Sequence, residues 1–133
     1  MPYYKIAFLT LCATRIKDSL FNTYILTDKN GKISVRVNGV GKLKSRFAKL
    51  NNPGLFCKGI VYLSKESGLL IITDAEIIDE FEHLKCSLAG LNCIAFITSI
   101  ISDLAPEKLS INGLFYDTIN FFRMKDCSKL TNI

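Results

Sequence analysis

The sequence predicts an α+β protein, mainly β in its N-terminal part, in which a small five-stranded barrel is followed by a short all-helical region. Two observations lead to this prediction. Five short segments rich in Ile, Val, Leu, Phe and Thr follow one another over residues 4–73, with turn signals between them, as in small barrels and sandwiches. After Asp74 the apolar residues recur every three or four positions, which indicates helices. We therefore expect two domains, over residues 1–80 and 81–133.

The five predicted strands are Tyr4–Thr14, Leu20–Thr27, Lys32–Val37, Leu55–Leu63 and Leu69–Thr73. A polar break, Arg15–Ser19, separates the first two. Asn30-Gly31 predicts a type I′ hairpin turn before the third strand, and Gly59 predicts a bulge or bend in the fourth. In the third strand, alternation puts Ile33, Val35 and Val37 on one face and Lys32, Ser34 and Arg36 on the other.

Two helices are expected after an acidic segment, Ala75–Glu82, that leads into the helical part. Ser87 is a suitable N-cap for a helix over Leu88–Asp103, which Ala105-Pro106 would end. This helix is apolar on nearly all sides, but it is too short to span a bilayer, so we expect it to be buried or to bind a partner. A second apolar stripe predicts a helix over Ile111–Met124.

The positive charge is concentrated in one stretch of the chain. The formal net charge is +5, and all of the excess lies in residues 1–80, where twelve cations face seven anions. No Asp or Glu occurs from Lys29 to Lys65, and the segment Lys32–Lys49, KISVRVNGVGKLKSRFAK, carries six cations. A surface of one sign suits a polyphosphate backbone, whereas the alternative interpretation is a solvated loop.

Among five-stranded barrels the OB-fold is the common nucleic-acid binder, which fits this charge pattern. We expect Phe47, inside the basic segment, to stack on bases. The residues expected to neutralise phosphates are Arg36, Lys42, Lys44, Arg46 and Lys49, and the supporting rim is Arg15, Lys32 and Lys58.

The sequence offers no catalytic constellation, so we expect a protein that is not an enzyme and that uses no cofactor or metal. His83 is the only histidine, and the carboxylates from Asp74 to Glu82 are interpreted as a strand end and a helix start, with a Mg²⁺ site as the alternative. Gly39–Lys42 lacks the Ser/Thr of a P-loop. The five cysteines are widely spaced and form no CxxC pair, which favours buried reduced thiols.

The chain resembles the RecO family of bacterial recombination mediators. The similar segments are KIAFLTL, then LFNTYILTDKNGKISVRVNGVGKLKSR with its hairpin and basic loop, then LLIITDAEIIDEF, and then SLAGLNCIAFITSIISDLAPE with LFYDTINFF. Their order extends over nearly all 133 residues. Family members are usually longer, so the resemblance is to a short or truncated member.

The resemblance implies an N-terminal OB-fold and a helical domain. It implies binding of single- and double-stranded DNA, strand annealing, and help to RecR in loading RecA onto DNA coated by single-strand-binding protein, in the cytoplasm at the nucleoid. The family's basic loop falls on Lys42, Lys44, Ser45 and Arg46. Docking of the single-strand-binding protein's tail falls on Leu88–Phe122, where the residues expected to take part are Leu91, Ile94, Phe96, Ile97, Ile101, Phe115 and Phe122.

A second function class stays open on the residues alone. Two apolar helices against one small barrel leave apolar surface uncovered, which suits an interaction module whose helices dock a partner or self-associate. In that case the basic face is incidental, and DNA binding is not the function.

Overall fold

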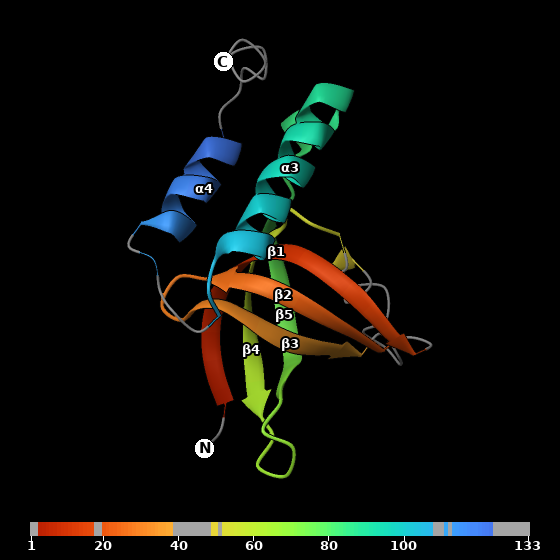
Figure 1. The fold of residues 1–133 in the computed structure, drawn as a ribbon, viewed down its shortest axis with the longest axis vertical. Helices are drawn as coiled ribbons and strands as arrows, with labels where there is room; N and C mark the ends of the chain where they lie inside the picture. Colours follow the sequence, from red (N-terminus) through yellow and green to blue (C-terminus); the bar gives the residue numbers. More distant parts are fainter. Residues whose placement is uncertain are drawn as a thin grey trace.

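The computed structural model describes residues 3–17, 20–38, 49–50, 52–107, 111 and 113–123. Five strands come first and helices follow, as the sequence predicts (Figure 1). The strands are β1 (Tyr3–Lys17), β2 (Leu20–Thr27), β3 (Gly31–Asn38), β4 (Phe56–Leu63) and β5 (Leu70–Asp79). The helices are α2 (Glu82–Lys85), α3 (Leu88–Leu104) and α4 (Leu114–Phe122).

The five strands close into a barrel in the order β1-β2-β3-β5-β4. Neighbouring strands are antiparallel except β3 and β5, which meet in parallel at Arg36 and Ile71. The long strand β1 pairs with β4 through its first half and with β2 over most of its length after Ala7, so it joins the two parts of the sheet. The predicted fold class, an OB-fold barrel followed by helices, is confirmed.

The alternation predicted for β3 is correct on its inner side. Ile33, Val35 and Val37 are all buried and belong to the hydrophobic cluster inside the barrel. Gly59 on β4 lies beside an irregularity of the β4–β5 ladder, as predicted, and a Cβ at Gly59 would come within 2.5 Å of the carbonyl oxygen of Asp74. The barrel therefore needs a glycine at this close approach of β4 and β5.

Several local predictions were wrong. β1 continues through Arg15 to Lys17, so the first part of the expected polar break Arg15–Ser19 is strand. β5 continues to Asp79, so most of the acidic segment is strand, in which Ala75 is buried while its neighbours Asp74 and Glu76 are exposed. The hairpin turn is not type I′, because Gly31 has a φ of 67° but Asn30 is not among the residues with positive φ. Instead, the Thr27 hydroxyl accepts a hydrogen bond from the Asn30 amide at 2.9 Å and donates one to the Gly31 carbonyl at 2.8 Å.

Among the described helices, α3 is the one that begins with a side-chain cap. The Ser87 hydroxyl accepts a hydrogen bond from the Gly90 amide at 3.0 Å, which confirms Ser87 as the N-cap of α3. The second predicted helix starts later than expected, at Leu114, because Gly113 takes a left-handed conformation with a φ of 79°. The four-residue helix α2 was not predicted.

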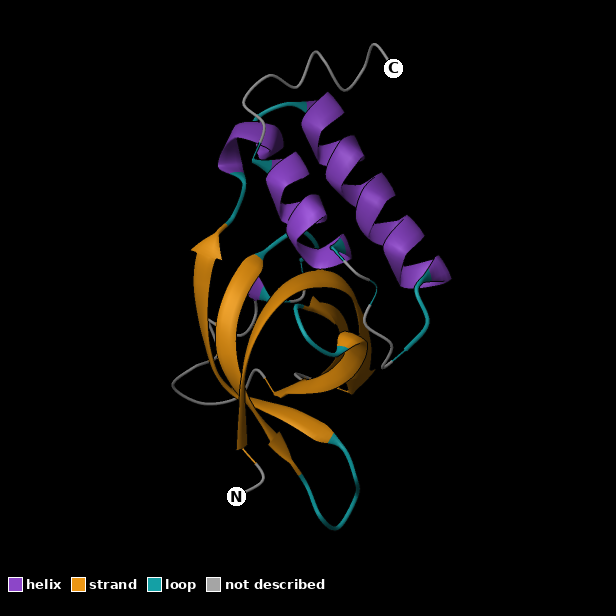
Figure 2. Cartoon of the chain, turned by 90° about the vertical axis from the view of Figure 1, so that its left-hand side faces the viewer, coloured by secondary structure: helices purple, strands orange, loops and turns teal. Residues whose placement is uncertain are grey.

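A second hydrophobic cluster joins the helices to the barrel. The helices lie together at one end of the barrel (Figures 1 and 2). Leu9, Leu11 and Leu26 on the outside of β1 and β2 pack there with buried side chains from the helices and from the preceding link, namely Phe81, Leu84, Ile94, Ile101, Ala105, Phe115, Ile119 and Phe122. The division into residues 1–80 and 81–133 stays a prediction, but strands and helices share this cluster.

Gly90 gives a first testable prediction. A Cβ at Gly90 would overlap the backbone of Leu84, so Gly90→Ala should lower the free energy of unfolding by about 1–3 kcal/mol through overpacking. Helix propensity alone predicts the opposite sign, a gain of about 1 kcal/mol. Thermal unfolding followed by circular dichroism measures the difference. The control is Ala95→Gly, an exposed position of α3 where only the propensity loss applies. A Gly90→Ala variant at least as stable as the parent contradicts this packing.

Candidate nucleic-acid interface

β1 and β3 end on either side of the first residue of β2. Lys17 pairs with Leu20 and Leu20 pairs with Asn38, so β1 ends beside the point where β3 ends. All three strands meet there at the right of Figure 1. After Asn38 the chain enters residues 39–48, which hold Lys42, Lys44, Arg46 and Phe47 and lie outside the described residues. We call Arg15, Arg36 and the segment 39–48 the basic end.

Arg36 is the described cation that β3 places on the outer side of the barrel at this end. It lies opposite Asn22 on β2 and beside Ile71 on β5. Its side chain is half-buried, and its Nε atom is buried with no hydrogen-bond partner among the described residues. Because the side chain is only half-buried, its exposed part can attract an anionic oxygen at the surface. Arg15 is exposed near the end of β1.

Lys32 lies elsewhere than expected. It is only 8 % exposed, its Nζ atom donates a hydrogen bond to the Ser102 carbonyl oxygen at 2.7 Å, and the same atom lies 5.3 Å from the centre of the Tyr24 ring. Ser102 is in the last turn of α3, where cations are favourable. The Lys32 ammonium therefore ties α3 to the barrel, which differs from its expected place on the phosphate-binding rim.

This placement gives a second prediction. Lys32→Met should lower the free energy of unfolding by about 1.5–3 kcal/mol, because a hydrogen bond from a charged donor is lost. It should leave DNA affinity unchanged if Lys32 contacts no phosphate. Denaturant unfolding and fluorescence anisotropy with a labelled oligonucleotide measure the two quantities. Lys29→Met, at the exposed hairpin turn, is the control for removing a lysine. Weaker DNA binding without a stability loss would return Lys32 to the interface.

Two further expected cations lie on other parts of the barrel. Lys58 is exposed on β4, where it pairs with Glu76 of β5. Lys49 is exposed, and its Nζ atom lies 3.8 Å from Glu80. Each of these two cations therefore has an acidic neighbour, whereas the sequence of residues 39–48 contains no Asp or Glu. Both are weaker candidates for phosphate contacts than Arg36.

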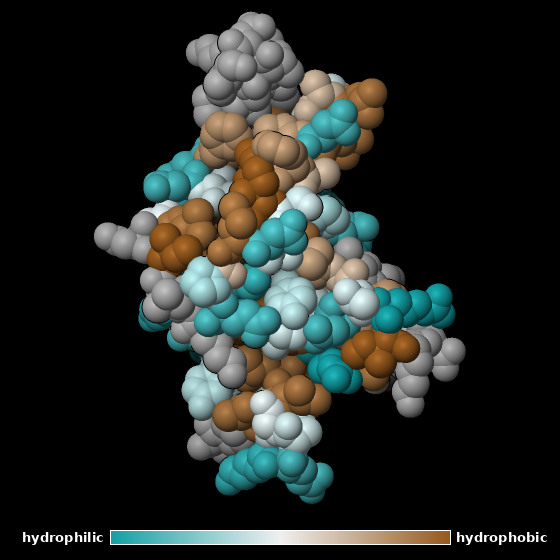
Figure 3. Space-filling model, viewed as in Figure 1, coloured by the Kyte–Doolittle hydropathy of each residue, from teal (hydrophilic) through white to brown (hydrophobic). Residues whose placement is uncertain are grey.

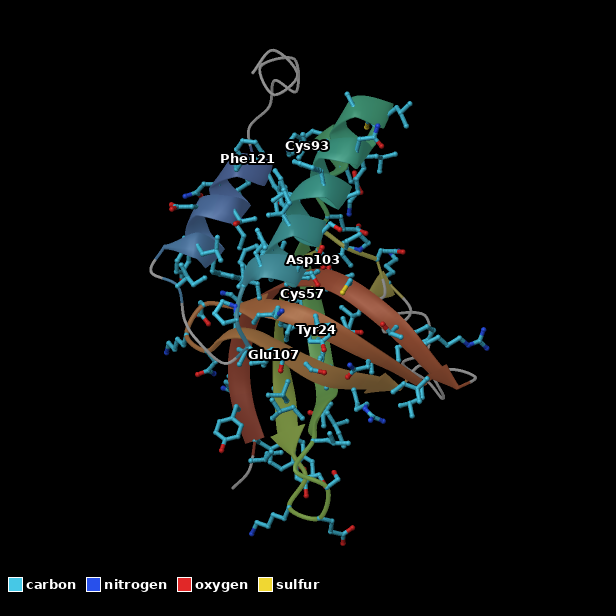
Figure 4. The ribbon with its side chains drawn as sticks, viewed as in Figure 1. Tyr24, Cys57, Cys93, Asp103, Glu107 and Phe121 are labelled. Atoms are coloured by element: carbon cyan, nitrogen blue, oxygen red, sulfur yellow. The ribbon has the colours of Figure 1, made fainter. Side chains whose placement is uncertain are left out.

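Tyr24 lies on the outer surface of β2 and β3. It lies opposite Ser34 and in the same alternation as Asn22, whose Oδ1 accepts a hydrogen bond from the Ser34 hydroxyl at 2.6 Å. The negative charge of Glu107, burial, and a hydrogen bond to that same carboxylate raise the pKa of Tyr24 above its ordinary value. Figure 4 shows Tyr24 and Glu107 on the same side of the barrel. Tyr24 and Asn22 are two positions apart on β2, so the alternation of side chains along a strand predicts that they share one face.

The residues expected to dock a partner divide into two groups. Four of them lie in the cluster between barrel and helices and are at most 7 % exposed: Ile94, Ile101, Phe115 and Phe122. Ile97 is half-buried, and Leu91 and Phe96 are exposed. The four buried residues hold the helices in place, which differs from their expected role at a surface. Leu88, Ile100 and Leu104, which were not selected, are exposed on α3.

Other polar and reactive groups were also located. In the part of the chain that the structure describes, no three His, Cys, Asp or Glu side chains are grouped to hold a metal ion. Cys57 is buried inside the barrel, and burial raises its thiol pKa to about 12. Cys86 is exposed, so the expectation of buried thiols holds for Cys57 but not for every cysteine. None of the described helices is both long and apolar enough to span a bilayer.

The comparisons with known proteins agree with one another. Residues 1–81 match the family model described as "Recombination protein O N terminal". Three similar relatives, each named DNA repair protein RecO, come from Halalkalibacterium halodurans, Shouchella clausii and Clostridium kluyveri. They are 27 %, 29 % and 28 % identical over 73 %, 68 % and 83 % of this chain. The matched part makes up 39 %, 35 % and 42 % of these relatives. Because the family model covers more than half of the chain, the chain belongs to the RecO family.

Proposed function

We propose that this protein is a DNA-binding module of the recombination-mediator type, which holds single- and double-stranded DNA at the basic end of its barrel. The observation that supports the proposal is the register of β1, β2 and β3, in which Arg15 pairs with Phe21 and Arg36 with the next residue, Asn22, so the two arginines lie near one end of the sheet. Lys42, Lys44 and Arg46 follow β3 in the sequence. The proposal has further support from the family and from a charge excess confined to residues 1–80.

The proposed mechanism is electrostatic and not catalytic. Cations at the basic end neutralise phosphates, and Phe47 stacks on a base. Binding is then nearly independent of sequence, and two complementary strands held on one basic surface repel each other less, which promotes annealing. Lys49 and Lys58 belong to the outer rim of this proposed surface, with smaller contributions because of their acidic neighbours.

The finer steps of recombination are part of the same proposal. We place the protein in the cytoplasm at the nucleoid, where it cooperates with RecR and with the tail of single-strand-binding protein to load RecA. On the described residues, the helical surface available to such a tail contains Leu91 and Phe96, because Ile94, Ile101, Phe115 and Phe122 are buried. The relatives' name, DNA repair protein RecO, supports this direction.

A salt series with labelled oligo-dT tests the proposal by fluorescence anisotropy. The logarithm of the binding constant should fall linearly with the logarithm of salt concentration, by about 0.7 for each phosphate contact on a single strand. A labelled duplex in the same series tests double-strand binding, and a strand-annealing assay with complementary oligonucleotides follows. Absence of binding even at low salt would overturn the proposal.

A second candidate function is an interaction module, favoured by exposed apolar side chains on α3. Phe96 is 67 % exposed and Leu91 is 45 % exposed on a helix that contributes Ile94 and Ile101 to the shared cluster. A labelled tail peptide of single-strand-binding protein, run beside the DNA series, separates the two candidates. Peptide binding that depends on Phe96, without DNA binding, would move the function to the helices.

A further inference from the structure

A stripe of apolar side chains runs along the outside of α3. Its members are spaced by three or four residues and share one side of the helix: Ala89, Cys93, Phe96, Ile100 and Leu104. Phe96, Ile100 and Leu104 are 67 %, 39 % and 77 % exposed. Figure 3 shows apolar side chains gathered over α3 and α4. We call these five residues the α3 stripe.

The two halves of the α3 stripe differ in side-chain size. The half near the start of α3 has small side chains, Ala89 and Cys93, whereas the half near its end has the large ones, Ile100 and Leu104. Two identical helices packed in antiparallel orientation therefore bring the large half of one against the small half of the other. With a twofold axis between residues 96 and 97, Leu104 meets Ala89 of the second copy, and Ile100 meets Cys93.

The charges of α3 fit the same arrangement. Asp103 is the only charged residue between Leu88 and Leu104, so two copies meet without a row of like charges. The antiparallel orientation brings Asp103 near the first turn of the second helix, where the free backbone amides favour a negative charge. A parallel pair would instead place the two Asp103 carboxylates together.

The size of the patch also bears on its occupant. The large side chains of the stripe are Phe96, Ile100 and Leu104, and each is at least 39 % exposed. Together they expose an apolar area on the order of a few hundred Å², which is part of the roughly 800 Å² per partner in a standard interface and suits a dimer that dissociates on dilution. Half-buried Phe121 of α4 adds to the helical apolar surface, and Figure 4 shows it and Cys93 at the same end of the helix pair.

We propose that two copies of this chain associate through their α3 stripes, antiparallel, about a twofold axis beside Phe96. This inference goes beyond the proposed function and does not rest on DNA binding. Its occupant is a second copy because the stripe is complementary to itself in side-chain size and in charge. The two barrels then belong to one particle.

Sedimentation equilibrium over a protein concentration series tests the association. The parent chain should be a dimer that dissociates on dilution. Phe96→Glu should shift it to a monomer, because two carboxylates would meet at the axis. Ala95→Glu, at an exposed position on a different side of α3, is the matched control and should remain a dimer. Circular dichroism checks that the variants fold, and Leu104→Glu provides a second variant at a 77 % exposed site.

A cross-linking experiment tests the antiparallel register. Ile100→Cys should place a thiol beside the native Cys93 of the second copy, so diamide should form a disulfide-linked dimer, the oxidant taking up two electrons and two protons. Mass spectrometry should locate the link between positions 93 and 100. Ala95→Cys is the control and should not exceed the dimer yield of the parent chain, which includes any background from exposed Cys86.

Several results would overturn the inference. A parent chain that stays monomeric up to its highest soluble concentration rules out the dimer. An equally stable dimer in both folded variants, Phe96→Glu and Leu104→Glu, places the interface elsewhere. A monomer whose stripe variants lose only the tail peptide of single-strand-binding protein assigns the stripe to that partner instead.

Discussion

Replacing Lys42, Lys44 and Arg46 by glutamate should reduce DNA affinity on the order of 100-fold or more and leave the fold intact. Each position lies in the acid-free run that follows β3, so each reversal removes an expected phosphate contact and adds a repulsion. The salt dependence should flatten as well. Losing three contacts at about 0.7 each changes the slope of the log–log salt plot by about 2 on single strands. Fluorescence anisotropy with oligo-dT measures both effects.

A matched control separates local contacts from overall charge. Lys5, Lys29 and Lys65 are exposed lysines away from the basic end, and replacing them by glutamate also lowers the formal charge by six, from +5 to −1. This control should lose far less affinity, because distant charges are screened within about 10 Å at 0.1 M salt. Equal losses in the two triple variants would show that net charge, and not the basic end, controls binding.

The second large effect concerns the link between barrel and helices. Phe81→Ala should lower the free energy of unfolding by about 3–5 kcal/mol, as expected for a large aromatic side chain removed from a core. Phe81 is fully buried between β5 and α2, and its ring lies 5.3 Å from that of Phe122 in an edge-to-face arrangement. The left-handed backbone conformation of residue 81, with a φ of 54°, is about equally unfavourable for Phe and for Ala. The loss of stability therefore measures the lost packing of the ring.

Denaturant unfolding measures this loss, and Tyr116→Ala is its control. Tyr116 is an aromatic residue on α4 that is 59 % exposed, so its truncation should cost less than about 1 kcal/mol. Because the shared cluster includes residues of β1 and β2 as well as the helices, barrel and helices should unfold in one transition. Two separate transitions, with only one of them moved by Phe81→Ala, would contradict this coupling.

The sequence predicted the barrel well because its signals are local. β2 has the predicted bounds, Leu20–Thr27, since a run of β-branched and aromatic residues ends at a turn signal. Ser87 was recognised as a cap from its position before an apolar helix. β5 was predicted too short because Asp74, Glu76 and Asp79 suggested a helix start. Its alternation of buried Ala75 with exposed acids indicates a strand, and pairing with β4 maintains it.

The candidate site was harder to predict because it depends on contacts between distant segments. Lys32 alternates with the core residues of β3, which indicates an outer position, but the outer face at that point is covered by the end of α3, 70 residues later. For the same reason, hydropathy alone did not separate buried Ile94 and Ile101 from exposed Phe96 and Ile100. Which side of an all-apolar helix faces the barrel is decided by packing against Leu9, Leu11 and Leu26.

The most direct test of DNA binding at the basic end is a titration of the ¹⁵N-labelled protein with oligo-dT, followed by amide chemical shifts. We expect the largest changes at Arg15, Leu20 and Arg36, where β1, β2 and β3 meet, and changes that fade as salt is raised. Lys58 and Glu76 on β4 and β5, and the amides of α3, should change little. Changes confined to the helices, or no change at low salt, would contradict DNA binding at the basic end of the barrel.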